Sequence, residues 1–413
     1  MNSIQTMHNS AVPSAATSPQ VQGTEAAMSS FLILLLAVCT GLAVASLYYS
    51  QPMLELMGRS VGAGDDQIGL VPTLTQLGYA LGILFLAPLG DRHDRRSIII
   101  IKAVVLTGAL LLTGFAHRLD VLLAASLAIG IAATLAQDIV PAAAMLAPAD
   151  QRGKVVGTVM TGLLLGILLS RVISGIVADQ WGWRAMFVAA AGGIALLGVA
   201  AWRFIPHIKA GTDLPYLSLL ASLATLWRTH RELRRAALAQ GLLAVGFSAF
   251  WSTLAILLHR EPFHLGSAVA GTFGLAGAAG ALDAPLAGHL SDRRGPELVT
   301  RVGAALTAIA FLAMSAYSWF SPTQQLWLLG FGAVLFDMGV QVTLIAHQTL
   351  IYKIDQNARS RLNAVLFVGM FTGMASGAFA GSQLLAHFGW IAVTGLASLS
   401  SLAALAVRLR APA

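Results

Sequence analysis

Apolar stretches of about 20 residues recur along the whole chain and are separated by short polar connections. A helix that crosses a bilayer needs about 20 mainly apolar residues, because nothing in the hydrocarbon region hydrogen-bonds to a free backbone amide. The pattern predicts twelve membrane-spanning helices, at residues 31–56, 68–89, 97–116, 121–146, 155–178, 185–205, 236–258, 268–289, 298–319, 325–350, 362–386 and 390–407. We therefore expect an all-α membrane protein.

Two hydrophilic segments divide this pattern. Residues 1–28 are rich in Ser, Thr, Gln and Ala and contain no Lys or Arg, which favours a disordered tail over a secretory signal. Residues 206–235 form the one long interior connection, which is basic. The expected organisation is a tail (1–28), a six-helix bundle (29–205), a central loop (206–235), a second six-helix bundle (236–407) and a short tail (408–413).

Composition supports the membrane assignment. Of 413 residues, 57% are hydrophobic and 10% are charged, with a mean hydropathy of +0.76. A soluble globular chain carries about 25% charged residues, so a soluble enzyme, a disordered protein and a nucleic-acid binder are excluded. The single cysteine, Cys39, excludes a disulfide framework and a cysteine-based metal site.

The positive charges predict the orientation. Of the 25 Lys and Arg residues, 20 fall in alternate connections and at the C-terminal end, and only Arg59, Arg118, Arg184 and Arg260 lie in the others. Because cytoplasmic loops carry the excess of Lys and Arg, both termini are expected to be cytoplasmic, in a cytoplasmic (inner) membrane. The net charge of +7 then reflects topology and indicates no nucleic-acid partner.

The chain also repeats itself. Asp91-Arg92 and Asp292-Arg293 are 201 residues apart and follow the second helix of each half. At an offset of 207, Arg152 and Lys154 fall on Arg359 and Arg361, Gly162 and Gly166 on Gly369 and Gly373, and Gly182-Trp183 on Gly389-Trp390. Two related six-helix halves are the layout of a transporter whose binding site lies between the halves.

These residues carry a family resemblance. The connection from Leu89 to Arg96 resembles the signature between the second and third helices of the major facilitator superfamily, and Gly288 to Gly295 is its second-half counterpart. The stretch from Gly157 to Gly175 is similar to the helix-five signature of the drug:proton antiporter branch, with Arg171 in place of its proline. Ala87 and Asp94 stand where the family usually has glycine. The resemblance covers roughly residues 30–407 and implies two pseudo-symmetric six-helix bundles and proton-coupled export.

The signature loops are candidate gates. A carboxylate at the end of the second helix can pair with a neighbouring helix N-terminus, where unpaired amides attract negative charge. By pseudo-symmetry we expect Asp91 near Arg359 and Arg361, and Asp292 near Arg152 and Lys154. The predicted cytoplasmic gate comprises Asp91, Arg92, Arg95, Asp292, Arg293, Arg152, Lys154, Arg359 and Arg361. The alternative is that these residues only anchor the topology.

Charges inside predicted spans are costly to bury and are therefore candidate functional residues. Asp337, near the middle of the tenth helix with Gln341 one turn on, and Asp138, beside Gln137 in the fourth, are the proton-coupling candidates. For Asp337, the alternative is a structural hydrogen bond or ion pair. Arg171 in the fifth helix lies about 24 Å from the cytoplasmic end and Asp138 about 12 Å, which disfavours a direct pair. Arg171 is expected to contact a substrate anion or to pair with another acid.

Polar and aromatic residues complete the predicted cavity. Pro52 leaves the Tyr48 carbonyl without its helical donor, which predicts a break in the first helix at membrane depth. The candidate cavity residues are Arg171, Gln51, Tyr48, Gln76, Gln137, Trp251 and Gln341. For any one of them apart from Arg171, the alternative is helix packing. The eighth helix spaces Gly271, Gly274, Gly277 and Gly280 three apart, which indicates close backbone packing with no ligand role.

No phosphate-cradling, zinc-protease or serine-hydrolase signature is present, so energy must come from an ion or substrate gradient. We expect a monomeric, cofactor-free secondary transporter, not an enzyme, that exports a small amphipathic or anionic compound in exchange for protons by alternating access. The alternatives are a proton-coupled importer of a metabolite and a membrane receptor that does not transport.

Overall fold

The computed structural model describes residues 28–208, 214–277, 290, 293–355 and 358–410, and every regular element within these ranges is helical. Among these residues, ten helical segments are long and apolar enough to cross a membrane. The elements are α1 (Ser30–Ala45), η1 (Gln51–Met53), α2 (Leu54–Val61), α3 (Asp65–Ile68), α4 (Leu70–Leu86), α5 (Leu89–Arg92), α6 (Arg95–Gly114), α7 (Leu119–Ala133), α8 (Leu135–Leu146), α9 (Arg152–Trp181), α10 (Trp183–Phe204), α11 (Tyr216–Thr229), α12 (Arg231–His259), α13 (Ser267–Thr272), η2 (Phe273–Leu275), α16 (Pro296–Ser315), η3 (Tyr317–Trp319), α17 (Pro322–Ile351), α18 (Arg359–Phe388) and α19 (Trp390–Leu409).

Each predicted span apart from the eighth coincides with helical structure. The eighth begins as α13 and η2 and is described only to residue 277. The predicted N-terminal tail up to residue 27, Gly280 and Asp292 lie outside the described residues. The predicted central loop contains α11, and α12 begins at Arg231, five residues before the predicted start of the seventh span.

The first span is interrupted where Pro52 predicts it. Helix α1 ends at Ala45, a turn follows, and Pro52 lies in the 3-10 segment η1. The carbonyl of Tyr48 accepts a hydrogen bond from the amide of Gln51 at 3.2 Å, which satisfies the acceptor that the proline leaves free. A one-residue interruption at Thr134 separates α7 from α8, but the two helices form one span, Leu119–Leu146.

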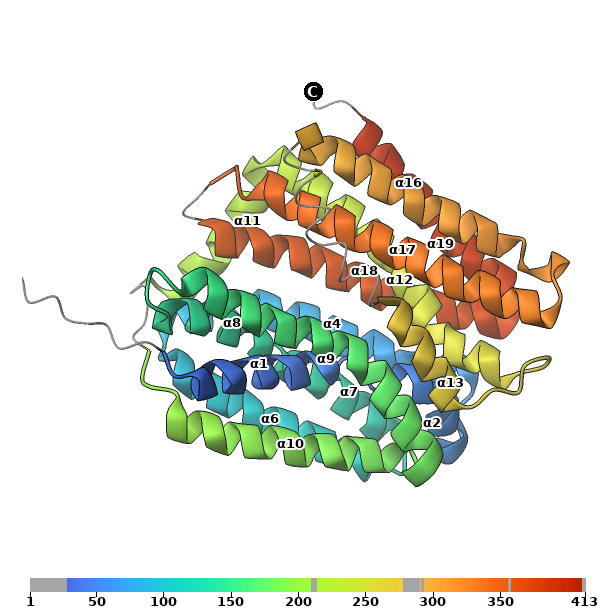
Figure 1. Cartoon of the computed structure of the whole chain (residues 1–413), viewed down its shortest axis with the longest axis horizontal. Helices are drawn as coiled ribbons and strands as arrows, with labels where there is room; N and C mark the ends of the chain where they lie inside the picture. The colour runs from blue at the N-terminus through green and yellow to red at the C-terminus, as the bar shows by residue number, and fades with distance from the viewer. Residues whose placement is uncertain (1–27, 209–213, 278–289, 291–292, 356–357, 411–413) are drawn as a thin grey trace, which may run out of the picture.

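The helices form two groups: α1–α10 lie in the lower part of Figure 1, and α12 and α16–α19 lie in the upper part, whereas α13 lies at the right beside the lower group. Glycines allow equivalent helices of each group to pack closely. A Cβ at Gly41 would lie 2.6 Å from the carbonyl oxygen of Gly162, and a Cβ at Gly241 would lie 2.9 Å from that of Gly369. The first and fifth spans of each group therefore approach at equivalent positions.

The ends of the bundle differ in charge. One end contains helix α11 and the first residues of α9, α12 and α18, and we call it the basic end. We call the other end of the bundle the opposite end. At the basic end of the second group, the buried Arg408 guanidinium binds Glu232 at 2.8 Å and also pairs with Glu297. These ion pairs connect α12, α16 and α19.

Candidate functional site

Arg171 lies at the centre of a buried cluster that joins the two groups of helices. Its Nε donates to Oε1 of Gln51 at 2.7 Å, and its Cζ lies 4.8 Å from the ring centroid of Tyr48 and 4.3 Å from that of Trp251. Tyr48 and Gln51 come from the interrupted first span, and Trp251 comes from α12 in the second group. Aromatic contacts of this kind stabilise a desolvated cation by about 2 kcal/mol.

Asp337 faces the same cluster from α17. Its carboxylate is buried and interacts electrostatically with Arg171, but the two form no ion pair. Among the described residues, three polar atoms here have no hydrogen-bond partner: Oδ1 of Asp337, Nη2 of Arg171 and Nε2 of Gln51. Buried polar atoms are normally paired, so this concentration indicates a place where a ligand or water completes the hydrogen bonding.

Glycines of the eighth span make room for both charged side chains. A Cβ at Gly274 would lie 2.9 Å from Cβ of Arg171, and a Cβ at Gly277 would lie 3.0 Å from Oδ2 of Asp337. Close backbone packing was the only role predicted for these glycines. Their contact with the side chains of Arg171 and Asp337 was not predicted. The available signal was the three-residue spacing of the glycines along the eighth span.

The other predicted cavity residues surround the cluster less directly. Gln76 on α4 is fully buried, and neither its oxygen nor its nitrogen has a hydrogen-bond partner. Gln137 donates to the hydroxyl of Tyr79 at 3.0 Å. Gln341 on α17 is half-buried. The structure therefore brings Arg171, Gln51, Tyr48 and Trp251 into direct contact, and leaves Gln137 paired with Tyr79 within the first group.

Asp138 has a different environment from Asp337. Its Oδ2 accepts a hydrogen bond from Nζ of Lys102 at 2.5 Å, and both side chains are buried. Oδ1 lies beside Gly90, where Arg95 also approaches. Asp138 therefore belongs to a buried ion-pair cluster at the basic end of the first group. Lys102 is one of the 20 charges that predict the orientation, and its pairing with Asp138 was not predicted.

The predicted gate residues make few ion pairs in this conformation. Asp91 accepts from Arg95 at 2.5 Å within its own segment. It makes no ion pair with Arg359 or Arg361, and among the described residues Arg92, Arg152, Lys154 and Arg293 make none either. Asp292, the other predicted gate acid, lies outside the described residues.

Asp94, which departs from the usual family pattern, has a structural role at the basic end. It begins α6 and accepts hydrogen bonds from the amide of Ile208 at 2.9 Å and from Nδ1 of His207 at 2.8 Å. Partial burial raises the pKa of Asp94, but these bonds and those from Arg96 and Ser97 outweigh it and hold the pKa below its usual value. This carboxylate links the segment between the second and third spans to the segment that follows the sixth span.

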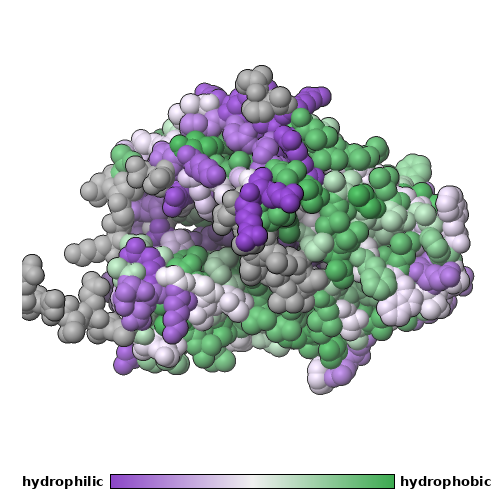
Figure 2. Space-filling view, turned by 45° about the horizontal axis from the view of Figure 1, so that its top comes forward, coloured by the Kyte–Doolittle hydropathy of each residue, from purple (hydrophilic) through white to green (hydrophobic). Residues whose placement is uncertain are grey.

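At the opposite end the two groups are joined by polar contacts. Asp179 of α9 accepts from the amides of Ser267 and Ala268 at 3.0 and 2.8 Å, and Arg260 pairs with Asp65. Gln383 donates to the carbonyl of Asp66 at 3.1 Å. At the left of Figure 2, hydrophilic residues surround a hollow between the upper and lower parts, whereas hydrophobic residues predominate to the right of the centre. The conformation is therefore closed at the opposite end.

The described residues contain no group of three His, Cys, Asp or Glu side chains arranged to hold a metal ion. The central cluster can instead bind charged and aromatic groups through Arg171, Asp337 and Trp251. This chemistry suits reversible binding without bond-making.

Comparisons with known proteins agree with this architecture. The family model described as Major Facilitator Superfamily matches residues 36–354 and 237–413. An uncharacterized transporter, YgaY, of Escherichia coli O157:H7 is 40% identical over 366 residues, which cover 89% of this chain and 92% of the relative. The multidrug resistance protein MdtG of Serratia proteamaculans is 26% identical, with 83% and 84% covered.

Solved structures share the fold at low sequence identity. A mutant form of the nucleoside transporter NupG superposes with a TM-score of 0.74 at 13% identity, covering 91% of this chain and 99% of that one. A bacterial homologue of the human lysosomal transporter Spinster, in an inward-facing and unoccupied conformation, gives a TM-score of 0.70 at 18% identity, covering 92% and 94%. The helical arrangement, the family match and the 40%-identical relative together establish that the chain belongs to the Major Facilitator Superfamily of membrane transporters.

Proposed function

We propose that this transporter exports a small amphipathic or anionic compound across the cytoplasmic membrane in exchange for protons. The observation that carries the proposal is the central cluster. A buried cation from one half, Arg171, and a buried acid from the other, Asp337, lie close together without an ion pair, and each has an unpaired polar atom. A binding site between two halves is the site that alternating access requires.

Each residue then has a distinct role. Arg171 binds an anionic or electron-rich group of the compound, and Tyr48 and Trp251 supply aromatic surface. Asp337 accepts the proton, because a buried carboxylate changes its charge state when a neighbouring charge arrives or leaves. Asp138, already paired with Lys102, stabilises the first half and carries no transported proton.

The orientation is part of the proposal. The basic end faces the cytoplasm, since cytoplasmic connections carry the excess of Lys and Arg. The structure is then closed on the outer side by the Asp179 and Asp65 contacts. Export as the direction draws on the helix-five resemblance and on the relative named a multidrug resistance protein.

The test is proton movement driven by added compound. Purified protein is reconstituted in liposomes that contain the pH indicator pyranine, and 1-naphthoate, ethidium or glucose is added. We expect one of the two amphipathic compounds, and not glucose, to drive a proton flux opposite to its own movement. Asp337→Asn should abolish this flux, and Asp138→Asn, in protein of equal folded yield, should retain it.

Three outcomes would contradict the proposal. Proton movement in the same direction as the compound would indicate a symporter. Binding of a compound without any flux would indicate a receptor. Unchanged coupling in Asp337→Asn would remove Asp337 as the proton site.

A further inference from the structure

Two grooves lie at repeat-related positions beside the close glycine contacts. The first, of about 410 Å³, runs between α1 and α9 and includes Val38, Gly41 and Leu165. The second, of about 840 Å³, runs between α12 and α18 and includes the equivalent residues Leu238, Gly241 and Thr372. Both grooves are almost wholly apolar, so the repeat supplies an internal comparison for what makes the second one larger.

The walls explain part of the difference. Leu165 and Leu169 in the first groove correspond to Thr372 and Ser376 in the second, at the offset of 207 that relates the halves. The shorter side chains widen the second groove. The hydroxyl of Ser376 donates to the carbonyl of Thr372 at 2.9 Å, so this polar group is satisfied within α18 and the wall remains compatible with an apolar ligand.

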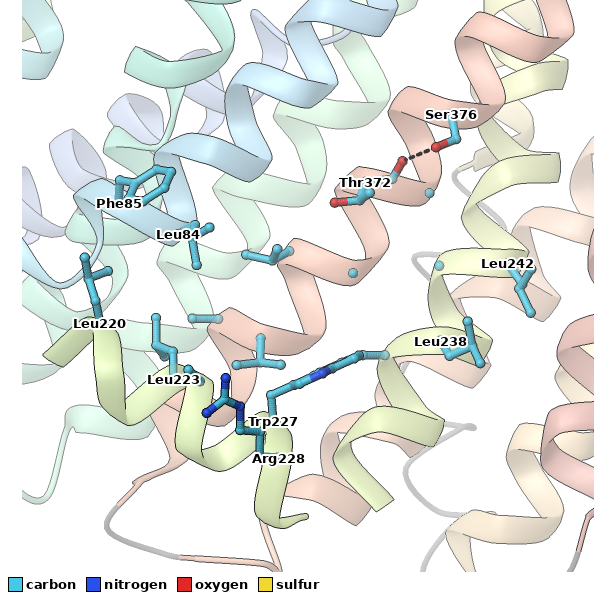
Figure 3. A pocket seen from close by; sticks show the side chains of 18 of the residues that line it. Leu84, Phe85, Leu220, Leu223, Trp227, Arg228, Leu238, Leu242, Thr372 and Ser376 are labelled. Atoms are coloured by element: carbon cyan, nitrogen blue, oxygen red, sulfur yellow. Dashed lines mark hydrogen bonds between the residues drawn. The ribbon is translucent and has the colours of Figure 1, made fainter. Parts of the chain in front are cut away.

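Helix α11 distinguishes the second groove further. It packs on the bundle through Leu219, Leu223 and Leu226, and it places Trp227 and Arg228 along the groove at the basic end. Figure 3 shows both side chains on α11 below the groove, with Leu84 and Phe85 of α4 at its other side. Arg228 is exposed and makes no ion pair among the described residues, so a free guanidinium stands at one end of an apolar groove.

The dimensions match one leaflet of a bilayer. The groove extends along α18 from Ala364 to Ser376, which is about 18 Å at 1.5 Å per residue. The hydrocarbon of one leaflet is about 15 Å thick, half of the bilayer core. An aromatic residue and a basic residue at the end of such a groove are typical of the membrane interface, where anionic headgroups attract Lys and Arg.

We propose that this groove is a binding site for an anionic phospholipid from the leaflet at the basic end. One acyl chain lies between α12 and α18 under α11, and the phosphate binds Arg228. The charge at the groove end and the length of the apolar channel select this ligand. In the part of the chain that the structure describes, the first groove has no covering helix and no basic residue in its lining, so we expect it to hold no lipid of this kind.

The experiment measures lipid retention by native mass spectrometry. Delipidated protein in detergent is titrated with dioleoylphosphatidylglycerol or with dioleoylphosphatidylethanolamine. We expect one phosphatidylglycerol to be retained at several-fold lower concentration than phosphatidylethanolamine. Arg228→Gln should abolish this preference, and Thr372→Trp, which fills the groove, should reduce retention of both lipids.

Matched variants control for general effects on the protein. Arg203→Gln removes an exposed arginine from the same end of the bundle, and Leu165→Trp enlarges the repeat-related position in the first groove. Both should bind as the wild type does. If Thr372→Trp does not fold, Ser376→Leu takes its place, because it introduces into the second groove the leucine that lies at the equivalent position of the first. Equal retention of the two lipids, or equal losses in Arg203→Gln and Arg228→Gln, would overturn the proposal.

Discussion

Arg171 shows why residue type matters at the centre of this fold. Its planar guanidinium lies against both Tyr48 and Trp251 while Nε binds Gln51. Lysine keeps the charge but lacks the planar fork and the stacking surface.

We therefore expect Arg171→Lys to weaken binding of an amphipathic anion about 10- to 100-fold, because a charged hydrogen bond contributes about 1.5–3 kcal/mol. The measurement is titration of the Trp fluorescence of purified protein with 1-naphthoate. Arg184→Lys is the matched control, since Arg184 lies 4.3 Å over Trp183 away from the cluster. Equal effects of the two substitutions would show that the central guanidinium has no special role.

The glycine beside Asp337 gives a second prediction. A methyl group at Gly277 would come within 3.0 Å of the carboxylate, so Gly277→Ala must move Asp337 or expel part of its surroundings. We expect at least tenfold slower compound-driven proton flux at normal protein yield. Gly192→Ala, where a Cβ would meet nothing within 4 Å, should be neutral. A normal rate in Gly277→Ala would contradict the assigned geometry.

At this scale the sequence predicted much of the central cluster. Arg171, Gln51, Tyr48 and Trp251 were identified because polar and aromatic residues are unusual inside apolar spans. The partners were harder to predict, since contacts across 120 positions, as between Gln51 and Arg171, depend on helix rotation. Lys102 was not predicted as the partner of Asp138, because it lies near the end of a span, where a lysine commonly anchors the helix at the membrane surface.

At the scale of helices, the ion pair between Lys102 of α6 and Asp138 of α8 allows a test of how much a buried ion pair stabilises the fold. Removing one partner from Lys102 and Asp138 leaves an uncompensated buried charge, which costs about 3–5 kcal/mol. We expect Asp138→Leu and Lys102→Met each to lower the thermal unfolding midpoint in detergent, and the double variant to recover most of the loss. The comparison is Arg118→Met with Asp120→Leu, an exposed pair whose removal should be nearly neutral. Additive losses in the first pair would argue against direct pairing.

Hydropathy predicted the spans well because the bilayer imposes their length, but it predicted α11 poorly. Leu219, Leu223 and Leu226 give this helix one buried apolar face, but its 14 residues are too few to cross a bilayer, so the search for spans did not find it. The break at Pro52 was predictable from a local rule, since proline cannot donate a backbone hydrogen bond. The interruption at Thr134 has no comparable marker in the sequence.

Over the whole molecule, the contacts at the opposite end should control the conformational equilibrium. Asp179 and Asp65 bind groups in the other half, so Asp65→Ala with Asp179→Ala should favour opening at that end. Spin labels at His117 and Trp319, in a Cys39→Ser background, report the separation of the halves there. We expect the distance distribution to extend to longer values.

A control acid at the same end completes this test. Asp120 pairs with Arg118 within one half, so Asp120→Ala should leave the distances unchanged. Identical distributions in the double variant and in the wild type would show that these contacts do not hold the end closed.

The gate shows a limit of sequence reasoning at this scale. Pseudo-symmetry pairs Asp91 with the start of α18, yet here Asp91 binds Arg95. A sequence describes all conformations together, whereas an ion pair between the halves exists in only some of them. The Asp91 contact with Arg359 and Arg361 remains a prediction for a state closed at the basic end.

Arg171 is held by Tyr48 and Gln51 from one half and by Trp251 from the other. Under the proposed function, a compound that binds the guanidinium would compete with the Trp251 ring for it. This contact between the halves would also slow reorientation of the protein without cargo, and so limit leakage of protons.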